Sequence, residues 1–262
     1  MNLKMFNLKG KLVLITGGGG LLGEMYAEAI LENGGGVVVA DLNDKAAQRV
    51  VEKLKQKYAD SKAWAIKMDV TDPESVRRAA ELFPAVNVLI NNAAKDPKVG
   101  GDGKISGFFE TMSLEEWKDG IESILTGTFV CCQIFCDKFA KEGGGVVINI
   151  SSDLGVIAPD QRIYKAGKKP ITYSAAKFGV IGMTKYLATY FADKNIRVNS
   201  LSPGAVYVDQ PKDFVDRLSQ LIPLGRMARK DEYKGAIVFM CSNASSYMTG
   251  ENIVMDGGRA TW

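Results

Sequence analysis

Short apolar runs alternate with longer stretches of helical period along almost the whole chain, and this alternation limits the folds open to it. Residues 37–40 and 146–148 are apolar on both faces, as in parallel strands that helices cover on each side. No internal repeat or shift of composition marks a second domain. The sequence therefore predicts one α/β domain, residues 1–262, built on a doubly wound parallel sheet with helices on both faces.

The expected strands span residues 11–16, 36–41, 63–68, 86–90, 146–151, 196–201 and 252–255. The expected helices span residues 21–33, 45–59, 73–82, 113–141, 172–193 and 231–241. Asp72 before Pro73, and Ser113 with Glu116, are the start signals of two of them. Loops at about 95–110, 155–171 and 204–225 follow strands, where such folds bind ligands, and are predicted to contact substrate.

Composition removes several kinds of chemistry. The chain has no histidine, which excludes histidine-based triads, imidazole proton shuttles and histidine zinc sites, and we expect no metal. The balance of 33 basic and 30 acidic residues gives no broad footprint for nucleic acid or a membrane surface, and neither partner is expected. Four cysteines do not form a disulfide framework, so a cytoplasmic protein is expected.

A glycine-rich turn, Gly17 to Gly23, joins the first strand to the first helix. Backbone amides at such a turn can approach a pyrophosphate closely. Asp41 ends the second strand, where a carboxylate accepts hydrogen bonds from the ribose of NAD and repels the extra phosphate of NADP. We therefore expect NAD in preference to NADP. The alternative is that Asp41 is a turn residue before Asn43, and that the glycines only form a loop.

Tyr173 and Lys177 stand at positions i and i+4 of an expected helix, so a phenol and an ammonium share one face. A cation beside a phenol favours the phenolate, which is what a tyrosine base needs near neutral pH. Tyr164 and Lys168 repeat the spacing, but Gly167 and a nearby proline make that segment a poor helix. The first pair is therefore the candidate acid/base site.

Six motifs resemble the short-chain dehydrogenase/reductase family in order and spacing over essentially the whole chain. They are Thr16-Gly17…Gly23, Asn91-Asn92-Ala93, Asn149-Ile-Ser-Ser152, Tyr173-xxx-Lys177, Arg197-Val-Asn199-Ser-Leu-Ser-Pro203-Gly204 and Thr249-Gly-Glu-Asn-Ile-Val-Met-Asp256-Gly257-Gly258. The resemblance implies a Rossmann fold, a homodimer or homotetramer, and hydride transfer between a nicotinamide cofactor and a small-molecule substrate.

The resemblance also assigns roles. Tyr173 is implied as the acid/base, Lys177 as the residue that lowers its pKa and holds the nicotinamide ribose, and Ser152 as the hydrogen-bond partner of the reacting oxygen. The residues expected at the cofactor are Gly17, Gly19, Leu22, Gly23, Asp41, Asp69, Val70, Asn91, Ala93, Tyr173, Lys177, Pro203, Gly204 and Val206.

Four positions depart from the family pattern. Leu21 and Ala94 stand where glycines are usual, and Val208 where a threonine commonly binds the carboxamide. Ile124 replaces an asparagine that helps to place a water for proton relay, and isoleucine has no donor or acceptor. The departures at Ile124 and Val208 leave open a second class of function, an NAD-binding regulatory subunit without turnover.

Twenty residues separate Ser152 from Tyr173, about eight more than the resemblance leads one to expect. This segment carries a basic cluster, Arg162, Lys165, Lys168 and Lys169. Asp153, Arg162 and Lys165 are the predicted substrate contacts. The basic side chains would receive a phosphate or carboxylate. The alternative is a solvated loop or a subunit contact.

The sequence of residues 152–164, together with Trp262, resembles the branch of this family found with flagellin modification and legionaminic-type sugar synthesis. This implies an anionic substrate, a phosphorylated or nucleotide-linked amino sugar. A 3-oxoacyl-carrier-protein reductase and a general sugar or polyol dehydrogenase are the enzymatic alternatives.

Two further groups of residues are assigned to packing. Cys131, Cys132 and Cys136 lack the spacing of metal ligands and are expected to pack a helix. A helix face formed by Met183, Tyr186, Leu187 and Tyr190 is expected in the core or at an interface.

Overall fold

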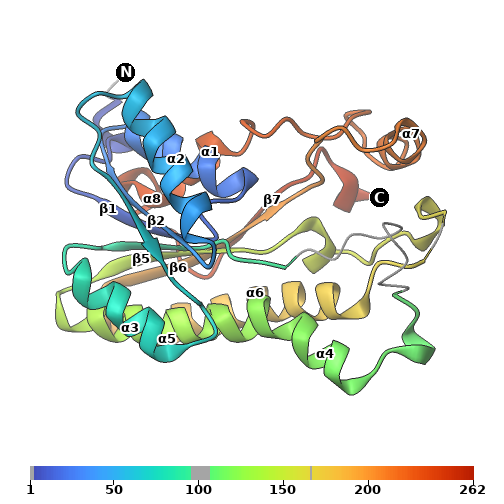
Figure 1. The fold of residues 1–262 in the computed structure, drawn as a ribbon, viewed down its shortest axis with the longest axis horizontal. Coiled ribbons are helices and arrows are strands. Elements are labelled where there is room, and N and C mark those ends of the chain that lie inside the picture. The colour runs from blue at the N-terminus through green and yellow to red at the C-terminus, as the bar shows by residue number, and fades with distance from the viewer. Residues whose placement is uncertain (1–2, 96–106, 166) are drawn as a thin grey trace.

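The computed structural model describes residues 3–95, 107–165 and 167–262. A parallel sheet with strand order β3-β2-β1-β4-β5-β6-β7 crosses the middle of the molecule (Figure 1). The strands are β1 Leu12–Thr16, β2 Gly36–Asp41, β3 Ala63–Lys67, β4 Val88–Asn91, β5 Gly145–Ile150, β6 Ile196–Pro203 and β7 Asn252–Met255. The doubly wound sheet expected from the alternation is confirmed, and the chain order reverses between β1 and β4.

Helices cover both faces of the sheet. α1, α2 and α8 lie on one face and α3, α5 and α6 on the other, with α4 projecting beyond the sheet (Figure 1). The helices are α1 Leu21–Glu32, α2 Asp44–Lys57, α3 Pro73–Leu82, α4 Leu114–Ile121, α5 Gly127–Lys141, α6 Ile171–Tyr190, α7 Lys212–Ser219 and α8 Lys234–Cys241. In the described ranges, no helix combines the length and apolar character needed to cross a bilayer.

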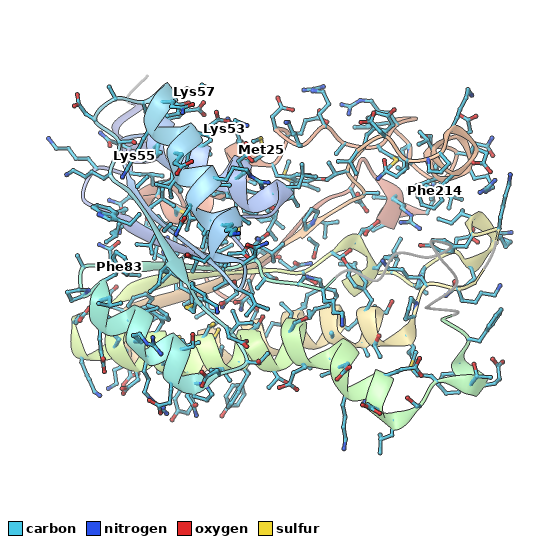
Figure 2. All side chains as sticks on the ribbon, in the orientation of Figure 1. Met25, Lys53, Lys55, Lys57, Phe83 and Phe214 are labelled. Carbon is cyan, nitrogen blue, oxygen red and sulfur yellow. The ribbon has the colours of Figure 1, made fainter. Side chains whose placement is uncertain are left out.

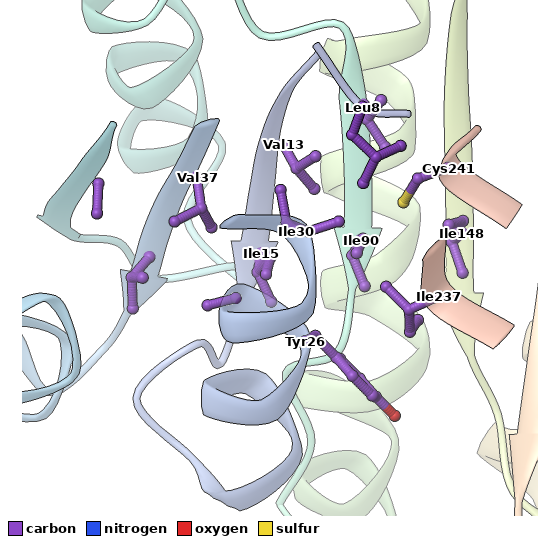
Figure 3. Packing of buried hydrophobic residues seen from close by; sticks show 14 of the residues in the cluster. Leu8, Val13, Ile15, Tyr26, Ile30, Val37, Ile90, Ile148, Ile237 and Cys241 are labelled. Carbon is purple, nitrogen blue, oxygen red and sulfur yellow. The ribbon is translucent and has the colours of Figure 1, made fainter. Parts of the chain in front are cut away.

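Two apolar clusters hold the layers together because successive strand residues point to opposite faces. Val13 and Ile15 of β1 face α1, where Tyr26 and Ile30 pack on them (Figure 3). Leu14, between them, belongs to the cluster on the other face, which Val76 and Ala79 of α3 and a run of α5 residues complete. The run comprises Val130, Cys131, Cys132, Phe135, Cys136 and Phe139. The packing role predicted for the three cysteines is confirmed.

The N-terminal caps of α3 and α4 form at the residues that the sequence indicates. The Asp72 carboxylate accepts a hydrogen bond from Glu74 N, and Pro73 opens α3. Ser113 and Glu116 form the reciprocal bonds of a capping box at the start of α4. Both pairs supply acceptors for amides that have no partner inside the helix.

The single helix expected over residues 113–141 is wrong. A π-helical turn, η3 Glu122–Thr126, separates α4 from α5, and Gly127 N bonds Glu122 O across it. An i→i+5 turn leaves no trace in an apolar period, so the pattern could not reveal it. The sequence also missed α7, which lies within the loop predicted at 204–225. Its eight residues form a helix through packing against neighbouring segments, because isolated helices of this length are unstable.

Candidate functional site

A cavity of about 890 Å³ opens at the carboxyl ends of the strands, beside the point where the strand order reverses. Thirteen of the predicted site residues line it, from the cofactor, catalytic and substrate sets. They are Gly17, Leu22, Asp41, Asp69, Val70, Ala93, Ser152, Asp153, Tyr173, Lys177, Pro203, Gly204 and Val206. The tertiary structure therefore brings most of the predicted site to one place.

The glycine turn is tight in a way that side chains would prevent. Gly17 has φ +60°, and a Cβ there would lie 2.8 Å from Ala93 Cα. A Cβ on Gly23 would lie 2.5 Å from Gly17 O, so Gly23 packs helix α1 against the turn rather than lining the cavity. Gly20 is the N-cap of α1 and supplies no side-chain acceptor, which leaves the first amides of the helix for a ligand. The turn therefore fits a bound pyrophosphate.

Leu21 is the first residue of α1 and is 42% exposed at the cavity. Its helical position requires no glycine, so the departure from the family pattern leaves the turn intact. The side chain adds an apolar surface beside the amides of the turn.

Asp41 makes the turn contacts that the sequence left as the alternative, and its place at the cavity leaves the cofactor role a prediction. One carboxylate oxygen accepts from Gly19 N at 3.0 Å and the other from Asn43 N at 2.9 Å. The residue thus fixes its own turn and the glycine turn, while it also lines the cavity. Gly19 lies behind this contact, where a Cβ would meet Ala46 and Asp41, and does not line the cavity.

At the carboxyl end of β4 the structure differs from one prediction. Asn91 does not line the cavity; its amide donates to Asn149 Oδ1 at 2.8 Å in the protein interior. Asn92, which was not predicted, lines the cavity and donates to Thr16 O and Gly17 O at 3.0 Å each. The side chains differ because neighbouring residues at a strand end point to opposite sides. Asn92 therefore clamps the glycine turn to β4.

The remaining predicted cofactor residues lie on other edges of the cavity. The Asp69 carboxylate accepts from Thr71 N at 2.9 Å and from Thr71 Oγ1 at 2.7 Å. A Cβ on Gly204 would lie 2.7 Å from Asp256 Cα, so the turn after β6 packs closely on the turn after β7. Tyr233 donates to Gly204 O at 3.0 Å, and burial raises the pKa of this tyrosine, which keeps it a donor.

Helix α6 carries Tyr173 in its first turn and Lys177 one turn later, as predicted. Lys177 is 3% exposed, and its ammonium donates to Ile150 O at 2.8 Å. Ser151 donates to Lys177 O at 2.8 Å, so the end of β5 is tied to α6 twice. Ser151 and Ser152 both line the cavity, and Leu154 N donates to Ser152 Oγ at 3.1 Å.

Ser152 is held by a buried ion pair that the sequence did not reveal. Its hydroxyl donates to Asp153 Oδ1 at 2.9 Å, and Asp153 Oδ2 lies 2.7 Å from Arg259 Nη1. The Asp153 and Arg259 side chains are 5% and 7% exposed, and both residues line the cavity. Asp153 was predicted to contact substrate, and the structure commits both its oxygens to protein partners. No motif or period marks Arg259 as its counterion.

Ile124 lies in the π turn and is 1% exposed. It forms an apolar cluster with Ala176 and Val180, and Tyr173 packs against this cluster. The position that departs from the family pattern is therefore an apolar support beneath the phenol.

The basic segment between Ser152 and Tyr173 is arranged differently from the prediction. Arg162 pairs with Asp160, whose pKa this pairing lowers to about 2, and Lys165 pairs with Asp213 of α7. Neither Arg162 nor Lys165 lines the cavity, because these acidic neighbours hold them at the outer surface. Lys169 of the same segment does line it.

This segment and α7 together cover one end of the cavity. Ile163, Leu218 and Ile222 share a small apolar cluster, and Tyr164 lies against Phe214 with ring centroids 5.8 Å apart. Phe214 projects from α7 far from the lysines of α2 (Figure 2). Of the predicted substrate loops, residues 155–165, 167–171 and 204–225 are described, whereas 96–106 lie outside the described residues.

Comparison with known proteins agrees with this geometry. A family model described as Enoyl-(Acyl carrier protein) reductase matches residues 21–260. D-threitol dehydrogenase of Mycolicibacterium smegmatis is 32% identical over 97% of this chain and 94% of its own. A 3-oxoacyl-acyl-carrier-protein reductase of Aquifex aeolicus is 32% identical over 96% and 98%.

Solved structures show the same fold. Gluconate 5-dehydrogenase of Burkholderia cenocepacia, in complex with NADP and tartrate, has TM-score 0.88 at 26% identity over 100% of both chains. A short-chain dehydrogenase of Leptospira borgpetersenii with bound NAD+ has TM-score 0.86 at 30% identity over 99% and 96%. With the motifs gathered in one cavity and these relatives along nearly its whole length, the chain belongs to the short-chain dehydrogenase/reductase family of nicotinamide-dependent oxidoreductases.

Proposed function

We propose that this oxidoreductase is an NAD-dependent dehydrogenase that acts on a secondary alcohol or ketone of a small polyhydroxylated substrate. The observation that carries the proposal is the single cavity lined by Ser152, Tyr173 and Lys177 together with Asp41. The glycine turn, Asp69 and the Pro203-Gly204 turn would hold the cofactor, which supplies the hydride acceptor or donor. Relatives named as dehydrogenases and a reductase argue against a regulatory subunit without turnover.

The protein side chains would handle the proton and the substrate oxygen. Tyr173 takes the proton of a substrate hydroxyl during oxidation and returns it during reduction. Lys177 keeps the phenol acidic by its positive charge and is fixed by Ile150 O. The Ser152 hydroxyl donates its hydrogen bond to the ion-paired Asp153 and accepts one from Leu154 N, so the second lone pair of its oxygen can accept from a substrate alcohol.

Asp41 supports NAD rather than NADP. Its carboxylate would bind the ribose hydroxyls and repel a phosphate in the same place. Replacing Asp41 with Ser is expected to raise the ratio of kcat/KM for NADP to that for NAD by at least about tenfold. Steady-state kinetics with both cofactors measure this ratio. Asp44→Ser, a matched change at the start of α2 outside the cavity, should leave it unchanged. A parent enzyme that already prefers NADP would contradict the assignment.

A polyol or sugar substrate is supported by the relatives and by the polar groups of the cavity. Relatives include enzymes named for D-threitol, glycerol and sorbose. Lys95 and Lys169 at the cavity favour, as a second candidate, the phosphorylated or nucleotide-linked amino sugar expected from the sequence. The 3-oxoacyl thioester of the Aquifex relative is the remaining alternative.

A substrate panel tests the proposal. Absorbance of NADH is followed with threitol, glycerol, sorbitol, uridine diphosphate N-acetylglucosamine, glucosamine 6-phosphate and an acetoacetyl thioester, in the direction that each permits. Turnover of the polyols supports the proposal, turnover of the anionic sugars supports the second candidate, and turnover of only the thioester rejects both.

A homodimer or homotetramer in the cytoplasm completes the proposal. Tyr186 and Tyr190 of α6 are each 63% exposed with ring centroids 5.8 Å apart, whereas Leu187 on the same helix packs into the core. Such an aromatic pair suits a subunit contact. Sedimentation should give an oligomer for the parent and a smaller species for the variant with Glu at both tyrosines. A monomeric parent would contradict this part.

Four buried free thiols suit a reducing compartment.

A further inference from the structure

A second ammonium group lies against the Tyr173 ring. Lys169 Nζ is 4.1 Å from the ring centroid, closer than Lys177 Nζ at 5.7 Å. The two lysines come from different segments, one from the loop before α6 and one from within α6. The phenol thus has two cations near it, of which the sequence motif contains only one.

The main chain of Lys169 is fixed in place. Gln161 donates to Lys169 O at 3.1 Å and accepts from Lys169 N at 2.9 Å, so one amide side chain bonds both the N–H and the C=O of Lys169. Pro170 follows as the N-cap of α6, and Tyr173 N bonds Pro170 O at 3.2 Å. The loop and the first turn of the helix therefore keep Lys169 and Tyr173 in a defined relation.

The apolar surroundings of the Tyr173 phenol explain why a second nearby cation affects its ionisation. Ile124, Ala176 and Val180 form an apolar support against which Tyr173 packs, and such a surface raises the cost of a phenolate. A nearby ammonium offsets that cost, and the positive end of the α6 dipole acts in the same direction.

Other charged groups near the phenol come from each neighbouring segment. Glu116 and Asp119 of α4 line a smaller pocket that Tyr173 also lines, together with Lys95. Asp153 is neutralised by Arg259 in its ion pair. The two α4 carboxylates would disfavour a phenolate, which increases the effect of a positive charge held against the ring.

We propose that Lys169 is a positioning residue that acts with Lys177 to stabilise the phenolate form of Tyr173. The inference rests on the proposed function, in which Tyr173 is the acid/base. The charge of Lys169 lowers the pKa of the phenol, so removal of that charge raises it. During oxidation the phenolate is the active form. When the phenol pKa rises, the acid limb of the pH profile of kcat/KM therefore moves to higher pH.

The first test compares variants at two adjacent lysines. Lys169→Met and Lys169→Gln remove the charge, Lys169→Arg keeps it, and Lys168→Met is the matched control outside the cavity. We expect the acid limb of kcat/KM for oxidation of threitol or glycerol to move up by about one pH unit in the Met and Gln variants. The Arg variant and the Lys168 variant should follow the parent. A rise in KM with an unmoved limb would assign Lys169 to substrate binding and overturn the proposal.

The second test needs no substrate. Tyrosinate absorbance is titrated in the parent and in Tyr173→Phe, and the difference isolates one phenol. The same difference in the Lys169→Met background should have its midpoint about one pH unit higher. An unchanged midpoint overturns the role of Lys169 even if activity falls. If none of the panel substrates is turned over but the midpoint moves, the assignment of function fails while the electrostatic coupling stands.

Discussion

Replacing Tyr173 with Phe is expected to lower kcat by about a hundredfold to ten-thousandfold, because the variant keeps the ring and loses the group that moves the proton. The ring packs against Ile124, Ala176 and Val180, and phenylalanine preserves those contacts. The thermal midpoint and NADH affinity should therefore stay close to those of the parent. Initial rates with the best panel substrate and NADH fluorescence titration measure the two quantities.

Tyr164→Phe is the matched control for this experiment. Tyr164 lines the same cavity and also precedes a lysine by four positions, but it lies in the loop after η5 Gln161–Ile163. We expect its rate to remain within a few fold of the parent. Equal losses in the two variants, or full activity in Tyr173→Phe, would contradict the assignment of Tyr173 as acid/base.

The second large effect is expected on stability. Arg259→Met leaves the Asp153 carboxylate buried without its counterion, which costs about 3–5 kcal/mol of unfolding free energy. Because the same carboxylate holds the Ser152 hydroxyl, activity should fall as well. Urea unfolding followed by fluorescence gives the change in free energy.

Two comparisons separate the buried ion pair from a general effect of removing arginine. Arg162→Met breaks a pair in which the arginine side chain is 89% exposed, and should cost no more than about 1 kcal/mol. The double variant Asp153→Asn with Arg259→Met removes both charges and should recover part of the lost stability. If the double variant is no more stable than Arg259→Met alone, the loss is due to the packing of the arginine and not to the uncompensated charge.

Features that depend on near neighbours in the chain could be predicted. The apolar runs give the strands because both faces are buried, with β2 and β7 at their expected bounds. Capping at Asp72 and Ser113 follows from side-chain acceptors two or three residues from the amides that they satisfy. The tight turn at Gly17 requires a positive φ. The π turn at η3 and the short helix α7 could not be predicted, since their stability comes from packing.

Local spacing and burial are enough to predict the parallel sheet, the glycine turn and the pairing of Tyr173 with Lys177. Which charged side chains reach the cavity depends on contacts between distant segments. Arg259 meets Asp153 across 106 positions, and neighbouring acids hold Arg162 and Lys165 at the surface while Lys169 lies against the phenol. These partners are set by how loops after different strands pack together, and no periodicity within one segment encodes a contact with another.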